Sequence, residues 1–343
     1  MSHLNVTIIG NEDMPGRNAV ALGVTKALVN HYHTTIFRPS AQLNDDFTNN
    51  LLRITNTPTT VEQVISKTPE TILSHKETVR GDIVARYHEV LATTDAQASV
   101  IIASDATPIY DPDLFTFDAT VAADLASPVF LTVSAKNRDA QQILQTIDAA
   151  NACILKSCTQ VLGVFVTGCS EGLGSELMRD YTARNYANSS EDATRVSQIP
   201  LWVLPQLENE TTECALQTFA RFVNENDVIN ALRQPYNAPI TPYAFQYSLL
   251  GKAKASKKTI VLPEGEEDRI LKAADYLLER DIVNIIIIGE RDAILARAEE
   301  LNLNSLHKAS FQSMHDEAML SHMVVKLCEL RAKKGLSLIH ISD

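Results

Sequence analysis

The sequence predicts an α/β protein with two parallel-sheet domains in a row, and three observations support this. Short apolar runs typical of strands alternate with helical patterns through most of the chain. Such strands, separated by helices, indicate βαβ units, whose parallel sheets are covered on both faces. The alternation is interrupted at residues 234–243, where prolines at 235, 239 and 242 block helix and sheet. A second, more regular strand–helix series follows.

The first series predicts a complete sheet domain over residues 1–205. Its apolar, β-branched runs predict strands at 4–10, 34–37, 99–103, 129–133, 161–166 and 201–204. The helical patterns lie at 19–31, 82–92 and 141–156. Residues 211–232 read as one amphipathic helix whose predicted buried face is Ala215, Phe219, Phe222 and Val223. We therefore expect a helical and proline-rich connection over residues 206–257.

The second series predicts strands at 259–262 and 284–289. Between them, acidic residues 266–268 begin a helix, where the helix dipole favours negative charge. Its predicted buried face is Ile270, Leu271, Ala274, Leu277 and Leu278. Further helices are predicted at 293–301 and 315–335. In the last of them, the apolar stripe is predicted to be core, and it consists of Met319, Met323, Leu327 and Leu330.

The composition of the chain argues against two classes of binding partner, nucleic acids and membranes. The chain has 343 residues, 45% of them hydrophobic, which suits a globular protein with two cores. Its net charge of −12 argues against a nucleic-acid partner bound through phosphates. No stretch approaches the ~20 apolar residues of a spanning helix, so no membrane partner is expected. The first residues also lack the features of a secretory signal, so we expect a cytoplasmic protein.

The five cysteines form no CxxC pair and no Cys/His spacing typical of a metal site; they are Cys153, Cys158, Cys169, Cys214 and Cys328. We expect scattered reduced thiols and no metal centre.

The loop after the first predicted strand is the best candidate site. Gly10 and Gly16 precede a helix, as the glycines of a phosphate-binding loop do. However, Arg17 and Asn18 replace the usual Lys and Ser/Thr, and residues 12 and 13 are acidic. We expect a P-loop-NTPase-like parallel sheet with a degenerate loop, in which Gly10, Gly16, Arg17 and Asn18 bind an anion only weakly. The strand that leads to Asp105 supports the same fold rather than an activity. Residues 170–175 are glycine-rich and predict a turn.

Residues 240–250 (ITPYAFQYSLL) and 257–274 (KKTIVLPEGEEDRILKAA) resemble the start of the catalytic domain of the phosphate acetyltransferase family. The resemblance continues through 278–280, 283–289 and 329–335. Residues 1–205 are similar, more loosely, to the N-terminal domain of the long members, which is itself like dethiobiotin synthetase. Arg38-Pro39 stands where Lys-Pro is usual in that domain.

The resemblance implies a second, three-layer α/β domain of the phosphate acetyl/butyryl transferase type, whose start is residues 258–337. It implies acetyl transfer between coenzyme A and phosphate, a step of acetate metabolism, with coenzyme A as a substrate and no cofactor. It also implies a homo-oligomeric full-length protein. The family's catalytic residues lie beyond the position of Gly335, so none is assigned here. We expect a C-terminally truncated, inactive chain, and we interpret residues 338–343 as a non-native tail.

Two alternatives for the first domain stay open. Residues 1–205 could form a metabolite- or nucleotide-sensing regulatory module without catalysis of its own. An ATP-dependent ligase or synthetase is disfavoured by Arg17, Asn18 and the acidic loop. For the incomplete second domain, we expect exposed apolar strand edges such as Ile285–Ile288.

Overall fold

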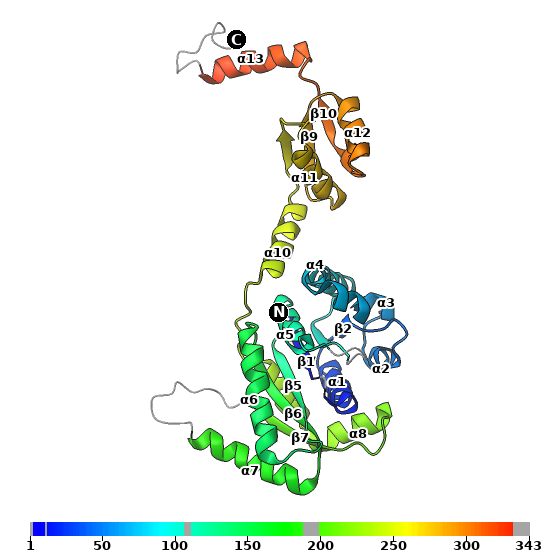
Figure 1. Cartoon of the computed structure of the whole chain (residues 1–343), viewed down its shortest axis with the longest axis vertical. Coiled ribbons are helices and arrows are strands. Elements are labelled where there is room, and N and C mark those ends of the chain that lie inside the picture. Colours follow the sequence, from blue (N-terminus) through cyan, green and yellow to red (C-terminus); the bar gives the residue numbers. More distant parts are fainter. Residues whose placement is uncertain (1–2, 11, 106–110, 188–198, 332–343) are drawn as a thin grey trace. The chain divides into compact units, whose positions relative to one another are not determined.

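The computed structural model describes residues 3–10, 12–105, 111–187 and 199–331. Its contacts divide the chain into two compact units, Met1–Tyr247 and Ser248–Asp343. In the described residues, each unit contains a parallel sheet, of seven strands in the first unit and three in the second (Figure 1). The predicted α/β class is therefore confirmed.

The first sheet has the strand order β3-β2-β4-β1-β5-β6-β7, and all its neighbouring strands are parallel. Its strands are β1 (Leu4–Ile9), β2 (Thr34–Ser40), β3 (Ile65–Lys67), β4 (Ala98–Ile102), β5 (Val129–Ser134), β6 (Val161–Cys169) and β7 (Leu201–Pro205). The strands β1, β2, β4, β5 and β6 are buried along most of their length, as expected for a sheet covered on both faces.

Helices cover both faces of this sheet. On one face α1 (Met14–Val29) contacts α2 (Asp46–Ile54), α8 (Thr212–Phe222) and α9 (Glu225–Leu232). On the other face the neighbours follow in the order α4 (Pro69–Thr94), α5 (Leu114–Asp124), α6 (Ala140–Lys156) and α7 (Glu171–Ala187). The short α3 (Val61–Val64) contacts α2 and α4. Helix α10 (Pro242–Ala255) begins in this unit, where Tyr247 stacks on His88 of α4.

The position of β1 determines where the candidate loop lies. Strand β1 pairs with β4 on one side and with β5 on the other. Since all three strands are parallel, the segments that follow their carboxyl ends meet at one edge of the sheet. Helix α1 begins at that edge, shortly after Gly10, and Gly16 lies in the first turn of the helix instead of in the loop before it. Open α/β sheets bind ligands at this edge, next to the point where the strand order reverses.

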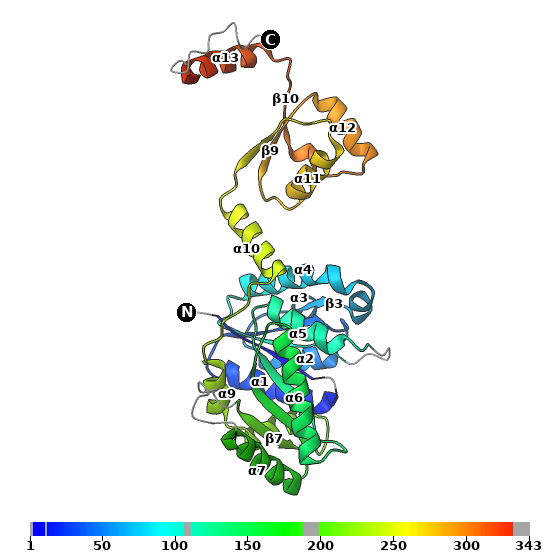
Figure 2. The ribbon, with the colours of Figure 1, turned by 60° about the vertical axis from the view of Figure 1, so that its left-hand side comes forward.

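The second unit has a small sheet of order β10-β9-β8, with β8 (Thr259–Leu262), β9 (Asn284–Ile288) and β10 (Ser310–Gln312). Its helices are α11 (Asp268–Glu279), α12 (Arg291–Glu300), the 3₁₀ turn η1 (Leu306–Lys308) and α13 (Glu317–Arg331). Helices α11 and α12 lie on the same side of the sheet (Figure 2). There they bury Leu271, Ala274, Leu278, Ile285 and Ile287, which confirms much of the predicted helix face.

Several predictions about individual elements are wrong. The helix predicted over 211–232 is two helices, because Val223 is extended and Asn224 caps α9 with its side chain. As a result Phe222 is 46% exposed instead of buried. Residues 171–175, part of the predicted turn, form the start of α7.

The predicted core stripe of the last helix is also wrong. Helix α13 has no buried residue, and Met323 and Leu330 are 55% and 73% exposed. The prediction of an exposed apolar edge at Ile285–Ile288 is wrong as well, because β9 is the central strand and both Ile285 and Ile287 are buried. The exposed apolar edge is β8, where Ile260 and Val261 are exposed. The last helix was predicted to end at residue 335, and residues 338–343 were predicted to be a non-native tail. Both positions lie outside the described residues.

The five cysteines are free thiols, as predicted. Within the described ranges, no helix combines the length and the apolar character needed to cross a membrane. In the same ranges, no three His, Cys, Asp or Glu side chains are grouped so that they could hold a metal ion.

Candidate functional site

The two predicted glycines lie where strand β1 leads into helix α1, and close packing explains both. A Cβ on Gly10 would overlap the Thr132 hydroxyl and lie 2.6 Å from the Thr132 carbonyl oxygen on β5. A Cβ on Gly16 would overlap the Asp13 carboxylate and lie 2.5 Å from the Thr167 hydroxyl on β6. These positions therefore require glycine for contacts within the protein, whether or not a ligand approaches the loop.

We expect Gly10→Ala to destabilise the first unit by about 1–3 kcal/mol, because the backbone carbonyl of Thr132 cannot move aside without straining β5. Gly172→Ala is the control, since no heavy atom lies within 4 Å of a Cβ at that helical position. We expect the control to be neutral or slightly stabilising. Urea unfolding followed by the fluorescence of Trp202, the sole tryptophan, measures both variants. Equal effects at the two glycines would contradict this account.

Arg17 points away from the loop and is completely buried. Its Nη1 donates to the carbonyl oxygens of Ala103 and Ser104, at 3.3 and 3.0 Å. Its Nη2 donates to Asp105 Oδ1 at 2.5 Å, and to the side-chain oxygen of Asn18 at 2.9 Å. The two residues that replace the usual Lys and Ser/Thr are therefore engaged with the end of β4 and with each other. Neither is free to hold a phosphate or a Mg²⁺ ion in the loop.

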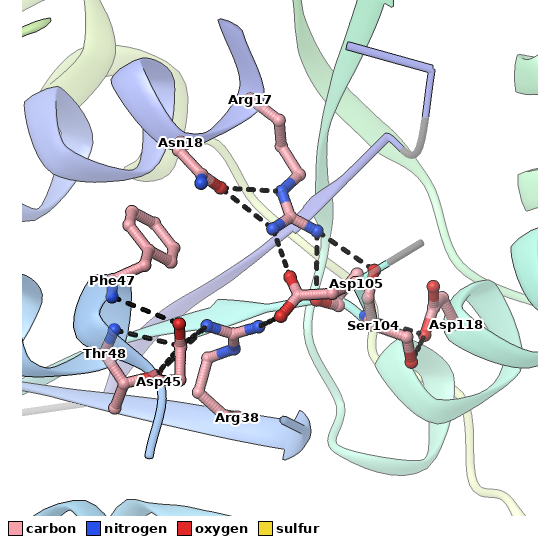
Figure 3. A network of polar contacts seen from close by, with 10 residues as sticks. Arg17, Asn18, Arg38, Asp45, Phe47, Thr48, Ser104, Asp105 and Asp118 are labelled. Carbon is pink, nitrogen blue, oxygen red and sulfur yellow. Dashed lines mark hydrogen bonds and ion pairs between the residues drawn. The ribbon is translucent and has the colours of Figure 1, made fainter. Parts of the chain in front are cut away.

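A second buried arginine, Arg38 at the end of β2, converges on the same carboxylate (Figure 3). Its Nη2 lies 2.7 Å from Asp105 Oδ2, and its Nη1 donates to Asp45 Oδ2 at 3.0 Å and to the Thr48 hydroxyl at 3.1 Å. Burial by itself would raise the pKa of Asp105, but the two guanidinium groups offset this and hold the pKa below its ordinary value. Asp105 thus stays ionised and bridges both arginines.

Asp118 of α5 completes the cluster. Its Oδ1 accepts hydrogen bonds from the Ser104 hydroxyl at 2.7 Å and from the Ser104 backbone N–H at 3.2 Å. Burial raises the pKa of Asp118 to about 6, although these hydrogen bonds and the nearby Arg17 charge oppose the shift. This carboxyl group therefore titrates close to neutral pH.

Sequence reasoning identified part of this cluster. The strand-end Asp105 and the substitution at Arg38 were both recognised, and the structure brings them together with Arg17. Asp45, Thr48 and Asp118 were missed. Asp45 and Thr48 carry a recognisable signal, because Asp45 caps α2 by accepting from the backbone N–H of Thr48. Asp118 carries none, since a lone acid within a helix is usually exposed.

A cavity of about 950 Å³ lies beside the loop at the carboxyl ends of β1, β5, β6 and β7. Its lining includes residues 12–16 and 134–139, together with side chains that follow β6 and β7. Arg138 closes one wall, because it donates to both carboxylate oxygens of Glu12, at 2.6 and 2.8 Å. These hydrogen bonds lower the pKa of Glu12. The cavity is separate from the arginine cluster, and only the α1 segment borders both.

Together these features define an α/β protein with a P-loop-like connection from β1 to α1. Next to this connection, the carboxylates of Asp105 and Asp45 neutralise the buried guanidinium groups of Arg17 and Arg38. The second unit carries the family signal. Residues 244–342 match the family model described as phosphate acetyl/butaryl transferase. This agrees with the resemblance predicted from residues 240–335.

The curated relatives are phosphate acetyltransferases. The protein of Helicobacter pylori is 42% identical over 113 residues, which are 33% of this chain and 22% of the relative. The protein of Nitratidesulfovibrio vulgaris is 32% identical over 133 residues, 38% of this chain and 18% of the relative. That of Nitrosomonas europaea is 24% identical over 255 residues, 71% of this chain and 35% of the relative. The chain thus spans 18–35% of the length of these relatives.

The chain is also similar, at low sequence identity, to solved structures of other proteins. A GTPase from Pyrococcus abyssi is 12% identical with a TM-score of 0.38, covering 68% of this chain and 98% of that one. The MinD cell division protein of Aquifex aeolicus is 10% identical with a TM-score of 0.37, covering 67% of this chain and 96% of that one.

Proposed function

We propose that this sequence belongs to a phosphate acetyltransferase, which converts acetyl-CoA and phosphate into coenzyme A and acetyl phosphate. The observation that carries the proposal is the family match over residues 244–342, together with the phosphate acetyltransferase relatives. In the reverse direction, the coenzyme A thiolate attacks the acetyl carbonyl, a C–S bond forms, and the C–O bond to phosphate breaks as phosphate leaves. Holding both substrates in one complex supplies much of the rate enhancement.

Within the residues 244–342 that match the family model, strand β8, a turn and helix α11 follow one another. Gly265 lies in its turn, where a Cβ would come within 2.5 Å of the Ile288 carbonyl oxygen on β9. A larger residue would force the turn away from the sheet. The close approach to β9 therefore explains why the turn over residues 263–265 has a glycine at position 265.

We further propose that residues 1–343 alone do not catalyse the reaction, because the matched segments cover only 18% and 22% of the first two relatives. We expect no turnover when this chain is given acetyl phosphate and coenzyme A and thioester formation is followed by absorbance. The whole protein, expressed from its gene, should form acetyl-CoA in the same assay. An inactive whole protein would refute the proposed function, whereas turnover by the 343-residue chain would refute only the proposed inactivity.

The proposal also covers the substrates, the oligomeric state and the cellular location of the enzyme. Its substrates are coenzyme A, acetyl-CoA, phosphate and acetyl phosphate, and we propose a homo-oligomer in the full-length protein. The five free thiols suit a reducing compartment, which supports a cytoplasmic location.

The cavity beside the P-loop-like connection favours a second function for the first unit, which is metabolite sensing. A cavity of about 950 Å³ is within the range of small-molecule sites, and the acetyl-transfer proposal gives it no role. The buried contacts of Arg17 and Asn18 speak against ATP hydrolysis there. We propose that the first unit binds a small molecule without transforming it.

A further inference from the structure

The ligand class of the cavity beside the P-loop-like connection can be inferred from its walls. This inference rests on the sensing proposal for the first unit and is independent of acetyl transfer. The cavity is bordered by the start of α1, by the segment after β5, and by the ends of β6 and β7. Its volume of about 950 Å³ accommodates a molecule with one or two rings.

The end of the cavity nearest α1 already contains an anion, the carboxylate of Asp13. Its Oδ2 accepts a hydrogen bond from the Thr167 hydroxyl at 2.7 Å. The same oxygen lies so close to Gly16 that a Cβ there would overlap it. The carboxylate therefore occupies the space over the first turn of α1 that a bound phosphate or carboxylate group would need. Asp13 is only half-buried, so it remains accessible from the cavity.

The charged side chains that line the cavity also disfavour an anionic ligand. The lining contains four carboxylates, those of Glu12, Asp13, Asp139 and Glu210, against the cations of Lys136 and Arg138. Glu12 and Arg138 neutralise each other through their two hydrogen bonds. The remaining lining residues therefore carry more negative than positive charge. A site with this balance attracts cations and repels anions.

The lining also contains apolar side chains from three segments of the chain. Met14 and Pro15 come from the start of α1, Leu173 from α7, and Pro205 and Leu207 from the segment that ends β7. These side chains offer a surface on which a compact apolar body can lie, and a ligand held by Asp13 would extend toward them. The cavity thus combines an apolar region with the half-buried Asp13 carboxylate and the exposed carboxylates of Asp139 and Glu210.

We infer that this cavity binds an organic cation, in which an apolar ring system carries an ammonium group that donates to the Asp13 carboxylate. Phosphate-bearing nucleotides are excluded by the same carboxylate. The first unit would then sense an amine, not a nucleotide.

Isothermal titration of the 343-residue chain with three probes tests the inference. Tryptamine and indole-3-acetate share one ring system and carry opposite charges, and ATP tests for phosphate recognition. We expect tryptamine to bind, indole-3-acetate to bind at least tenfold more weakly, and ATP not to bind. In Asp13→Asn, the amide oxygen can still accept from Thr167 but the charge is lost, so we expect tryptamine affinity to fall about tenfold. Glu210→Gln removes one charge from the same lining and should change affinity much less.

Each outcome decides a separate point. Equal or tighter binding of indole-3-acetate or ATP would overturn the cation inference and leave the sensing proposal intact. An equal loss in Glu210→Gln would overturn the assigned contact with Asp13. Absence of binding by all three probes would overturn both sensing and the inference, without bearing on acetyl transfer. If Asp13→Asn failed to fold, the comparison of the two indole probes in the unmodified chain would still decide the ligand's charge.

Discussion

Replacing Asp105 with Asn is expected to lower the free energy of unfolding of the first unit by about 3–5 kcal/mol. The side chains of Arg17 and Arg38 are both completely buried, and Asp105 contacts each of them, at 2.5 and 2.7 Å. Asparagine has nearly the same volume, so the variant removes the charge and leaves the packing. The completely buried guanidinium of Arg17 would then keep only neutral hydrogen-bond partners, and removing the charged partner of a buried cation is strongly destabilising.

Urea unfolding followed by Trp202 fluorescence measures this loss, because Trp202 lies on β7 and is buried. Asp148→Asn is the matched control. It breaks the ion pair of Asp148 with Arg184, in which the Asp148 side chain is 68% exposed. Exposed pairs of this kind contribute about 0–1 kcal/mol. A loss in Asp105→Asn no larger than in this control would show that the two arginines find other compensation.

The arginine cluster also shows how far the residues alone predict the site. The pattern of glycines correctly predicted a P-loop-like connection between the first strand and the first helix, while the weak anion binding expected from Arg17 and Asn18 stays a prediction. The direction of the Arg17 side chain was not predictable, because it depends on Asp105, 88 residues further along the chain. Local pattern carries no information on such a distant pairing. The sheet order, which brings β1 and β4 together, creates the contact.

The errors in the helices have a different cause. Periodicity predicts which face of a helix is apolar, but it cannot say whether another element covers that face. The stripe of α11 is buried because the small sheet lies against it, whereas the equally apolar residues of α13 are exposed. Similarly, the helical pattern of 211–232 continues through Val223, and only the extended conformation there ends α8. Propensity is a weak guide where a single residue determines a helix end.

Asp118 gives the second large prediction, which concerns pH. Its pKa is raised from 3.8 to about 6 by burial, so the folded state binds this proton more tightly than the unfolded state does. The stabilisation from the protonated group is complete below the unfolded pKa and is lost as pH rises through the folded pKa. Across the window from pH 3.8 to about 6, the loss amounts to about 3 kcal/mol, at 1.36 kcal/mol per pKa unit.

Asp118→Asn removes this titration, while its amide oxygen can still accept from the Ser104 hydroxyl and N–H. The difference in unfolding free energy between variant and unmodified chain should therefore rise by about 2.4 kcal/mol in favour of the variant from pH 4 to pH 7, because the unfolded carboxyl group is already partly ionised at pH 4. Taking the difference matters, because Asp105 and Glu12 have lowered pKa values and stabilise the fold increasingly as pH rises. Their contributions are common to both proteins and cancel. A difference that stays constant over this range would mean that Asp118 is already ionised in the folded state at acidic pH. In that case the charge of Arg17, and not burial, would dominate its environment.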